Sequence, residues 1–420
     1  MKTVVSCLLV VTLLALPLVA APAPSGKPEE VGLSAERLQR ITEMLKRRIG
    51  AGDLAGAVAV VARRGKVAYV SAQGVADIET RQPMTPAAMF RIASMTKPVV
   101  GVGIMLLVEE GRLRLNDPVS RYIPEFREMK VAMARPGGGG RGQAAGAAAA
   151  APQFYTVPAQ REITIKDLLT HVSGLGSGPM GNSDIAKVAR KEGETLAAYI
   201  PRLGRTTLEF QPGTRWTYSP GAGFETLGRI IEVASGTPLD RFFRTRIFDP
   251  LGMKDITFWP ADEQMPRVAT VYARTAKGLT RSETPNDTLS RNIYFRGSGG
   301  LYSTAEDYIP LGIMLANGGE MGGKRLLSRK SVEMMRAAHV LDTLPGRPAG
   351  EGYGLSVRVV TNHAARNTLL SDGTYGWSGA QGTHFFVDPV EQLVGVLMVQ
   401  TSNQEIIRDF EDLVAQSIAD

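Results

Sequence analysis

The chain has 420 residues, a formal net charge of +7, 44% hydrophobic residues and 21% charged residues. This length and composition are typical of a globular protein with one large domain or two interleaved ones, and they exclude disordered and fibrous classes. The basic residues are dispersed without a long run, which argues against nucleic acid as a partner. Cys7 is the only cysteine, so the chain after it has no disulfide framework and no cysteine metal site.

The first twenty residues resemble a secretion signal. Lys2 precedes an apolar stretch over residues 4–16, and Ala20 offers a small residue for cleavage. Pro17 closes the stretch, which is short for a bilayer span. We therefore predict a signal peptide over residues 1–20 and a mature chain over 21–420 without a stable membrane anchor. The expected location is periplasmic or secreted, in a bacterium.

A helix and a hairpin are predicted next. Apolar residues at helical spacing over residues 34–49, with Ser34 as a suitable N-cap, indicate an amphipathic helix. Two β-rich runs follow at 56–61 and 67–70, and Arg64-Gly65 between them indicates a tight turn.

The segment Phe-Arg-Ile-Ala-Ser-Met-Thr-Lys-Pro over residues 90–98 contains an S-x-x-K pair, Ser94 and Lys97. Residues 99–108 are apolar nearly all round, which predicts a buried helix with Ser94 at its N-terminus. A serine hydroxyl needs a neighbouring base to attack at neutral pH, and Lys97 lies one helical turn away. Apolar surroundings lower the pKa of a lysine, which favours that role. A solvated helix face is the alternative.

The middle of the chain has helical patches separated by many Gly and Pro residues. Residues 137–152 are Gly- and Ala-rich, which predicts a flexible surface insertion. The predicted helices cover residues 165–170, 195–203, 223–234 and 239–247.

The C-terminal part predicts strands again, so the fold class is α/β (α+β). We expect an antiparallel sheet built from both chain termini and flanked by helices, with an inserted mostly helical region. The sheet part covers about residues 30–90 and 300–420, and the helical part about 91–299. The C-terminal elements are helices at 305–316, 328–337 and 406–418, and strands at 354–360, 382–387 and 393–400.

Three further segments carry candidate site residues. Tyr218 lies in a glycine-bounded loop, where its phenol is a candidate proton relay or else a packed aromatic. Small residues over 376–382 allow a ligand to approach a strand backbone closely, although a tight turn is the alternative. His171 is interpreted as a structural hydrogen-bonding residue, and its neighbour Asp167 as a solvated one.

Together these segments resemble the β-lactamase-related serine hydrolase superfamily, from about Glu30 to the C-terminus. The likeness is to class C β-lactamase-type esterases and transesterases, with a fold like that of penicillin-binding proteins, and to D-aminopeptidases and D-alanyl-D-alanine carboxypeptidases. It is carried by residues 90–97, 167–175, 212–219, 299–307 and 377–389.

The resemblance implies roles for the matching residues. Ser94 would be the acylated nucleophile, Lys97 its base and Tyr218 a second general acid/base. The backbone N–H groups of Ser94 and Ala380 would form the oxyanion hole. No cofactor or metal is expected, because the four histidines lack ligand spacing. The substrate-binding residues would be Trp377, Ser378 and Gly379.

Two departures from the family pattern shape the expected function. The motif Tyr218-Ser219-Pro220 lacks the usual asparagine, and Trp377 stands where the family usually has a cationic residue. An aromatic wall favours an apolar acyl or alcohol group, so we expect an exported serine hydrolase that cleaves small-molecule carboxylic esters. The alternatives are a β-lactamase, a D-alanyl-D-alanine carboxypeptidase or a D-aminopeptidase that uses the same residues on an amide, and a non-catalytic binding protein.

Overall fold

The computed structural model describes residues 23–135, 154–283 and 290–420. The predicted signal peptide at 1–20 and the predicted insertion at 137–152 lie outside these residues. Across the three described ranges, no helix is both long enough and apolar enough to cross a bilayer.

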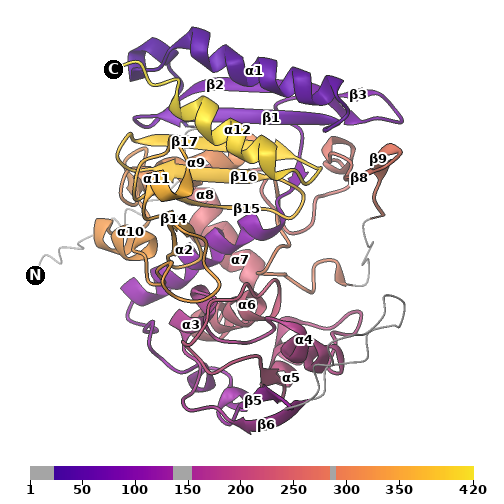
Figure 1. Cartoon of the computed structure of the whole chain (residues 1–420), viewed down its shortest axis with the longest axis vertical. Helices are drawn as coiled ribbons and strands as arrows, with labels where there is room; N and C mark the ends of the chain where they lie inside the picture. The colour runs from indigo at the N-terminus through magenta and orange to yellow at the C-terminus, as the bar shows by residue number, and fades with distance from the viewer. Residues whose placement is uncertain (1–22, 136–153, 284–289) are drawn as a thin grey trace, which may run out of the picture.

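An eight-stranded antiparallel sheet forms the upper layer of the molecule (Figure 1). Its order is β13-β14-β15-β16-β17-β1-β2-β3, so strands from the two ends of the chain meet where β1 pairs with β17. The predicted sheet from both termini is therefore confirmed. Its strands are β1 (Gly56–Arg63), β2 (Lys66–Asp77), β3 (Gln82–Pro83), β13 (Glu351–Tyr353), β14 (Arg358–Val360), β15 (Tyr375–Ser378), β16 (His384–Asp388) and β17 (Leu393–Val399).

The hairpin between β1 and β2 forms where the sequence predicts it. Arg64 and Gly65 adopt φ values of 50° and 76°, and two consecutive positive φ angles match the right-handed twist of the flanking strands. All eight residues of β1 are buried, because helices cover both faces of the sheet at this position.

Helices α1 (Ala35–Gly50) and α12 (Gln404–Ala415) cover one face of the sheet, and α9 (Ala305–Ala316) covers the other (Figure 1). The Ser34 side chain accepts a hydrogen bond from the Arg37 N–H at 3.2 Å, which confirms the predicted N-cap of α1. The core between the sheet and the two outer helices is apolar, with Leu38, Ile41, Leu45, Phe410 and Val414 among its buried members.

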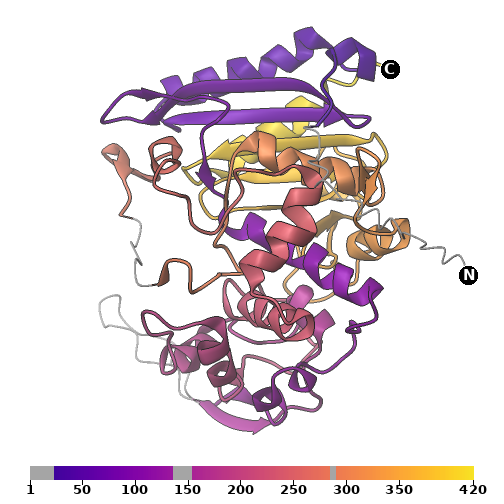
Figure 2. The same ribbon diagram turned by 180° about the vertical axis from the view of Figure 1, so that it is seen from behind.

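The helical region lies beside the sheet, and the buried helix α2 (Thr96–Glu109) runs between the two layers (Figure 2). Small strand pairs also occur in and around it: β4 (Phe90–Arg91) with β10 (Tyr302–Ser303), β5 (Lys130–Ala134) with β6 (Phe154–Pro158) and β7 (Thr207–Leu208), and β8 (Tyr272–Thr275) with β9 (Gly278–Arg281). Its helices are α3 (Ile165–Leu169), α4 (Pro179–Ala186), α5 (Leu196–Leu203), α6 (Ala222–Ser235), α7 (Leu239–Phe243) and α8 (Asp249–Leu251).

The structure corrects two of the expected elements. Only residues 358–360 of the strand predicted at 354–360 form a strand, β14, because Ser356 in the turn before it adopts a φ of 69° and donates its N–H to the Leu169 carbonyl. The helix predicted at 239–247 ends as α7 and continues as a π-helical turn, Arg244–Phe248. Helix α4 and the β5–β6 hairpin were not predicted. The remaining elements are β11 (Glu320–Met321), β12 (Lys324–Arg325), α10 (Arg329–Arg336) and α11 (His363–Arg366).

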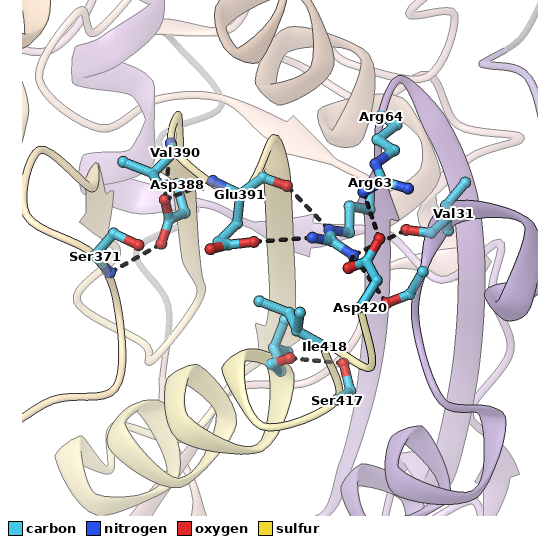
Figure 3. A network of polar contacts seen from close by, with 12 residues as sticks. Val31, Arg63, Arg64, Ser371, Asp388, Val390, Glu391, Ser417, Ile418 and Asp420 are labelled. Atoms are coloured by element: carbon cyan, nitrogen blue, oxygen red, sulfur yellow. Dashed lines mark hydrogen bonds and ion pairs between the residues drawn. The ribbon is translucent and has the colours of Figure 1, made fainter.

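The C-terminal residue is tied to the sheet by a buried arginine (Figure 3). Arg63, at the end of β1, bonds the Asp420 carboxylate at 2.6 Å and the Glu391 carboxylate at 2.8 Å. The same guanidinium donates to the carbonyl oxygens of Val31 and Gly32. Segments from both chain ends therefore meet at one side chain.

Candidate active site

Ser94 lies in a single 3₁₀ turn, Ala93–Met95, between β4 and α2. The turn is fixed upstream by the Ile92 N–H, which donates to the Leu301 carbonyl at 3.0 Å. Ala93 adopts a φ of 44°, which is uncommon for a residue with a side chain and is maintained only where the surroundings hold it. The backbone is thus constrained immediately before the serine.

Ser94, Lys97 and Tyr218 are in direct contact. The Ser94 Oγ lies 2.6 Å from the Tyr218 hydroxyl and 3.1 Å from the Lys97 Nζ. Lys97 Nζ also donates to the carbonyl oxygens of Ser298, at 2.6 Å, and Pro220, at 3.1 Å. Carbonyl oxygens only accept hydrogen bonds, so a neutral Lys97 uses both of its hydrogens on them. Its lone pair then faces Ser94, which is the orientation that a base requires.

Burial lowers the pKa of Lys97 to about 7. The side chain is 0% exposed, and removal from water disfavours its ammonium form. The negative charge of Glu225 opposes this effect, while the positive charge of Arg296 adds to it. The lowered pKa expected from the apolar helix is present, so a large fraction of Lys97 is a free amine at neutral pH.

Tyr218 is held by His171 on both sides of its backbone. The Thr217 N–H donates to the His171 carbonyl at 3.1 Å, and the Ser219 N–H donates to His171 Nδ1 at 3.2 Å. The His171 ring also packs against the Tyr218 ring, with centroids 4.8 Å apart. Burial raises the pKa of Tyr218, so the residue is a phenol at neutral pH and a proton donor towards Ser94.

His171 is a buried, uncharged residue. Burial, the Lys97 charge and the Arg347 charge hold its pKa well below the usual range, so Nδ1 is free to accept from Ser219. Asp167, interpreted above as solvated, is in fact 6% exposed. Its carboxylate caps α3 through Thr164 and pairs with Arg161 at 3.0 Å, because a cap carboxylate satisfies backbone donors at a helix start.

The Trp377–Ala380 segment packs against the serine turn. Gly379 donates its N–H to the Thr383 carbonyl at 2.7 Å, and a Cβ at this position would lie 2.4 Å from the Ile92 carbonyl oxygen. Only glycine permits this approach. The Trp377 ring meets the Tyr218 ring at 5.6 Å and the Tyr353 ring at 5.2 Å, so an indole forms the wall beside the phenol.

Ser378, predicted to bind substrate, has its hydroxyl 2.8 Å from Nδ1 of His384 on the neighbouring strand. His384 Nε2 in turn lies 3.0 Å from the carboxylate of Glu411 on α12. Glu411 also pairs with Arg358 and Arg366. The side chain of Ser378 is therefore engaged by a polar network that reaches away from Ser94.

A cavity of about 510 Å³ opens beside the nucleophile. Ser94 and Ala380, the two residues predicted to form the oxyanion hole, both line it. Trp377, Ser378 and Gly379 are not among its described lining residues. The remaining walls include Arg91 at the end of β4, Arg190 between α4 and α5, residues 258–259, and residues from the 290–302 segment such as Arg296.

Glu225 is a residue of the site that sequence reasoning missed. It lies on the buried side of α6, where its carboxylate accepts hydrogen bonds from Tyr294 and from Ser298, the latter at 2.9 Å. The same Ser298 supplies a carbonyl oxygen to Lys97. A carboxylate between the apolar residues Phe224 and Leu227 of the predicted helix was the available signal.

Across residues 23–135, 154–283 and 290–420, no group of three or more His, Cys, Asp or Glu side chains is arranged to hold a metal ion.

A serine hydroxyl in contact with a buried amine and a phenol, beside a cavity large enough for a small ligand, has the composition of a serine hydrolase site. The full-length sequence supports this class. The β-lactamase family model matches residues 41–416, so the chain belongs to the β-lactamase family.

The similar proteins include an esterase. The chain is 29% identical over 406 residues to Esterase EstB of Burkholderia gladioli, covering 90% of this chain and 95% of that one. It is 35% identical over 363 residues to an uncharacterised protein of Mycobacterium tuberculosis, covering 83% and 86%.

Solved structures share the fold. EstCE1, described as a hydrolase with promiscuous acyltransferase activity, superposes with a TM-score of 0.73 at 25% identity, covering 92% of this chain and 99% of that one. Unliganded simvastatin synthase from Aspergillus terreus gives a TM-score of 0.72 at 19% identity, covering 91% and 98%. The predicted superfamily and enzyme class, a β-lactamase-related serine hydrolase, are confirmed.

Proposed function

We propose that this serine hydrolase cleaves carboxylic esters through an acyl-enzyme formed on Ser94. The observation that carries the proposal is the Trp377 indole, which packs against Tyr218 where the family resemblance leads one to expect a cationic side chain. At that strand position an indole provides no charge for a lactam or peptide carboxylate, and it offers an apolar surface beside Tyr218 instead. The similarity to an esterase of Burkholderia gladioli supports this choice.

In the acylation step, the neutral Lys97 takes the proton of Ser94 as its Oγ forms a bond to the ester carbonyl carbon. The carbonyl oxygen becomes an oxyanion, and the N–H groups of Ser94 and Ala380 would stabilise it. Tyr218 donates its proton to the departing alkoxide, which leaves as the alcohol. The proton held by Lys97 then restores the phenol.

In the deacylation step, a water molecule gives a proton to the free amine of Lys97 and attacks the acyl carbon. The bond to Ser94 breaks, and the Ser94 oxygen regains a proton from the ammonium group. The balanced result is one carboxylic acid and one alcohol from one ester and one water. An alcohol in place of water would transfer the acyl group instead.

The test is hydrolysis of 4-nitrophenyl butyrate by the purified protein and by Ser94→Ala. We expect a burst of nitrophenol equal to the enzyme concentration, acylation of Ser94 by a fluorophosphonate probe, and loss of both in the variant. Turnover that is unchanged in Ser94→Ala would sink the proposal.

A β-lactamase or D-alanyl-D-alanine carboxypeptidase activity is the second candidate. Its support is a 27% identity over 403 residues to a putative D-alanyl-D-alanine carboxypeptidase of Salmonella typhi. The same three residues would act on an amide, so substrates alone distinguish the two. Efficient nitrocefin or D-alanyl-D-alanine hydrolysis with negligible ester turnover would reverse the ranking.

We also propose that the protein is exported, since residues 1–20 have the pattern of a secretion signal. Mass spectrometry of the protein from its native cells should find an N-terminus near residue 21 and a location outside the cytoplasm. A full-length chain in the cytoplasmic fraction would contradict this.

A further inference from the structure

The described lining of the cavity beside Ser94 contains more basic than acidic side chains. Among the described residues that line it, three are arginines, Arg91, Arg190 and Arg296, and none is an aspartate or a glutamate. A cleft with charge of one sign and low-dielectric walls concentrates ligands of the opposite sign. The charge of the cavity is therefore expected to influence which esters bind there.

Two of the arginines are fixed on aromatic rings that also line the cavity. The Arg91 guanidinium lies 5.1 Å from the Tyr302 ring centroid, and that of Arg190 lies 4.4 Å from the Tyr294 centroid. Arg190 also donates to Ser290 Oγ at 2.6 Å. A guanidinium stacked on a ring keeps its charge and its planar donor edge while it loses conformational freedom.

Arg296 differs from the other two arginines in the surroundings of its guanidinium N–H donors. Its nearest carboxylate oxygen in the described structure is Glu225 Oε1, at 3.8 Å from Nε. Glu225 already accepts hydrogen bonds from Tyr294 and Ser298. Arg296 makes no hydrogen bond to a residue that the structure describes. The Arg296 side chain is 55% exposed. It presents a solvated cation at the edge of a cavity that contains the nucleophile.

On this basis we infer that the cavity holds an anionic group of the substrate, so that the preferred ester carries a carboxylate which Arg296 binds. The inference rests on the ester hydrolysis proposed above and specifies its substrate class. A guanidinium binds a carboxylate through two parallel hydrogen bonds, and the aromatic rings beside it accommodate the connecting carbon chain. The carboxylate belongs either to the acyl part or to the alcohol part of the ester.

Two matched substrate pairs test the inference and identify the part that carries the charge. The acyl pair is 4-nitrophenyl hydrogen adipate and 4-nitrophenyl hexanoate, which differ by a terminal carboxylate in place of a methyl group. The alcohol pair is 4-acetoxybenzoate and phenyl acetate. We expect kcat/KM to favour the anionic member of one pair by about tenfold or more, as hydrogen bonds to charged groups contribute, and the preference to fall as salt is added.

Arg296→Gln should reduce the ratio of kcat/KM between the anionic and the neutral ester of the pair to near unity, with both esters measured on the same variant at the same pH, and Arg296→Lys should retain part of the preference. The control is Arg329→Gln, which removes an exposed arginine on α10 that does not line the cavity. Thermal melting and labelling of Ser94 by a fluorophosphonate would verify that each variant is folded.

The outcomes separate the two proposals. No hydrolysis of any of the four esters contradicts the proposed esterase function itself. Hydrolysis of the neutral esters with equal or lower kcat/KM for both anionic ones overturns the inference alone. A preference that is the same in Arg296→Gln and the wild type overturns it as well, because Arg296 is then not the residue that binds the carboxylate.

Discussion

Two buried cations in this molecule have opposite surroundings. Arg63, at the end of β1, is 3% exposed and is surrounded by the Asp420 and Glu391 carboxylates and by carbonyl oxygens (Figure 3). Lys97, on α2, is 0% exposed and has carbonyl oxygens, a hydroxyl and aromatic rings around it. Among the described groups within hydrogen-bond distance of Lys97, there is no carboxylate.

The difference separates a structural cation from a reactive one. Carboxylates stabilise the charged form of a buried cation, so Arg63 serves as a fixed link between chain segments. Burial disfavours the charged form of Lys97, and no described carboxylate lies within hydrogen-bond distance to offset this effect, so its pKa falls to about 7. The composition of the surroundings, more than the depth of burial, decides the role.

Lys97→Met should give the largest effect on catalysis of the variants compared here. The variant removes the proposed base, and kcat for 4-nitrophenyl butyrate should fall about 10²–10⁴-fold, the range for general acid–base catalysis. The melting temperature should change little, because a buried amine is replaced by an apolar chain of similar length. A variant with wild-type kcat would exclude Lys97 as the base.

Arg63→Met should have the opposite effects, a loss of stability with kcat unchanged. It removes five hydrogen bonds from one side chain, and the carbonyl oxygens of Val31 and Gly32 lose a donor. Urea denaturation should show a loss of about 2–3 kcal/mol, the range for hydrogen bonds to charged groups. The folded fraction should retain wild-type kcat, and a large loss of kcat with unchanged stability would contradict a structural role.

His171 can be compared with Arg63 and Lys97, because it is a third buried basic side chain. Its proposed role is to position Tyr218. His171→Leu removes the acceptor for the Ser219 N–H, so Tyr218 is less well placed and kcat should fall about tenfold at similar KM, since small displacements of a catalytic group are costly. His171→Asn retains a short polar acceptor and tolerates the φ of 59° at this position.

We therefore expect Asn to recover much of the kcat that Leu loses, with steady-state kinetics as the measurement. Equal kcat values for the two variants would mean that the acceptor at His171 does not position Tyr218.

Glu225→Gln should give the smallest effect, a shift in the pH dependence of kcat/KM. Lys97 acts as a base only when neutral, so kcat/KM should fall as the pH decreases through about 7, where Lys97 gains a proton. Glu225 raises the pKa of Lys97 and Arg296 lowers it. Removal of the Glu225 charge should therefore move the acid limb to lower pH.

The other groups that face Lys97 in this experiment are Ser94, Tyr218 and His171, and the variant leaves them unchanged. The matched control is Glu333→Gln, an exposed carboxylate on α10. A pH profile that is the same for Glu225→Gln and the wild type would show that Glu225 does not set the pKa of Lys97.

Local sequence patterns predicted much of this protein. The S-x-x-K pair, the apolar α2 helix and the hairpin turn at Arg64-Gly65 each depend on residues within about one element, where helical spacing, apolar periodicity and positive-φ residues act directly. The same patterns failed at residues 354–360, since a β-rich run is broken there by a turn that donates to the distant Leu169 carbonyl.

The sequence by itself identified two of the groups that we propose carry the chemistry, because a serine, a lysine three residues later and an apolar helix are adjacent in the chain. Only the tertiary structure decided the electrostatics of those groups. Pro220 and Ser298, whose carbonyl oxygens orient the Lys97 amine, lie 123 and 201 residues away from it. The charges of Glu225 and Arg296 act on Lys97 in the same way, because packing brings together segments that no local pattern connects.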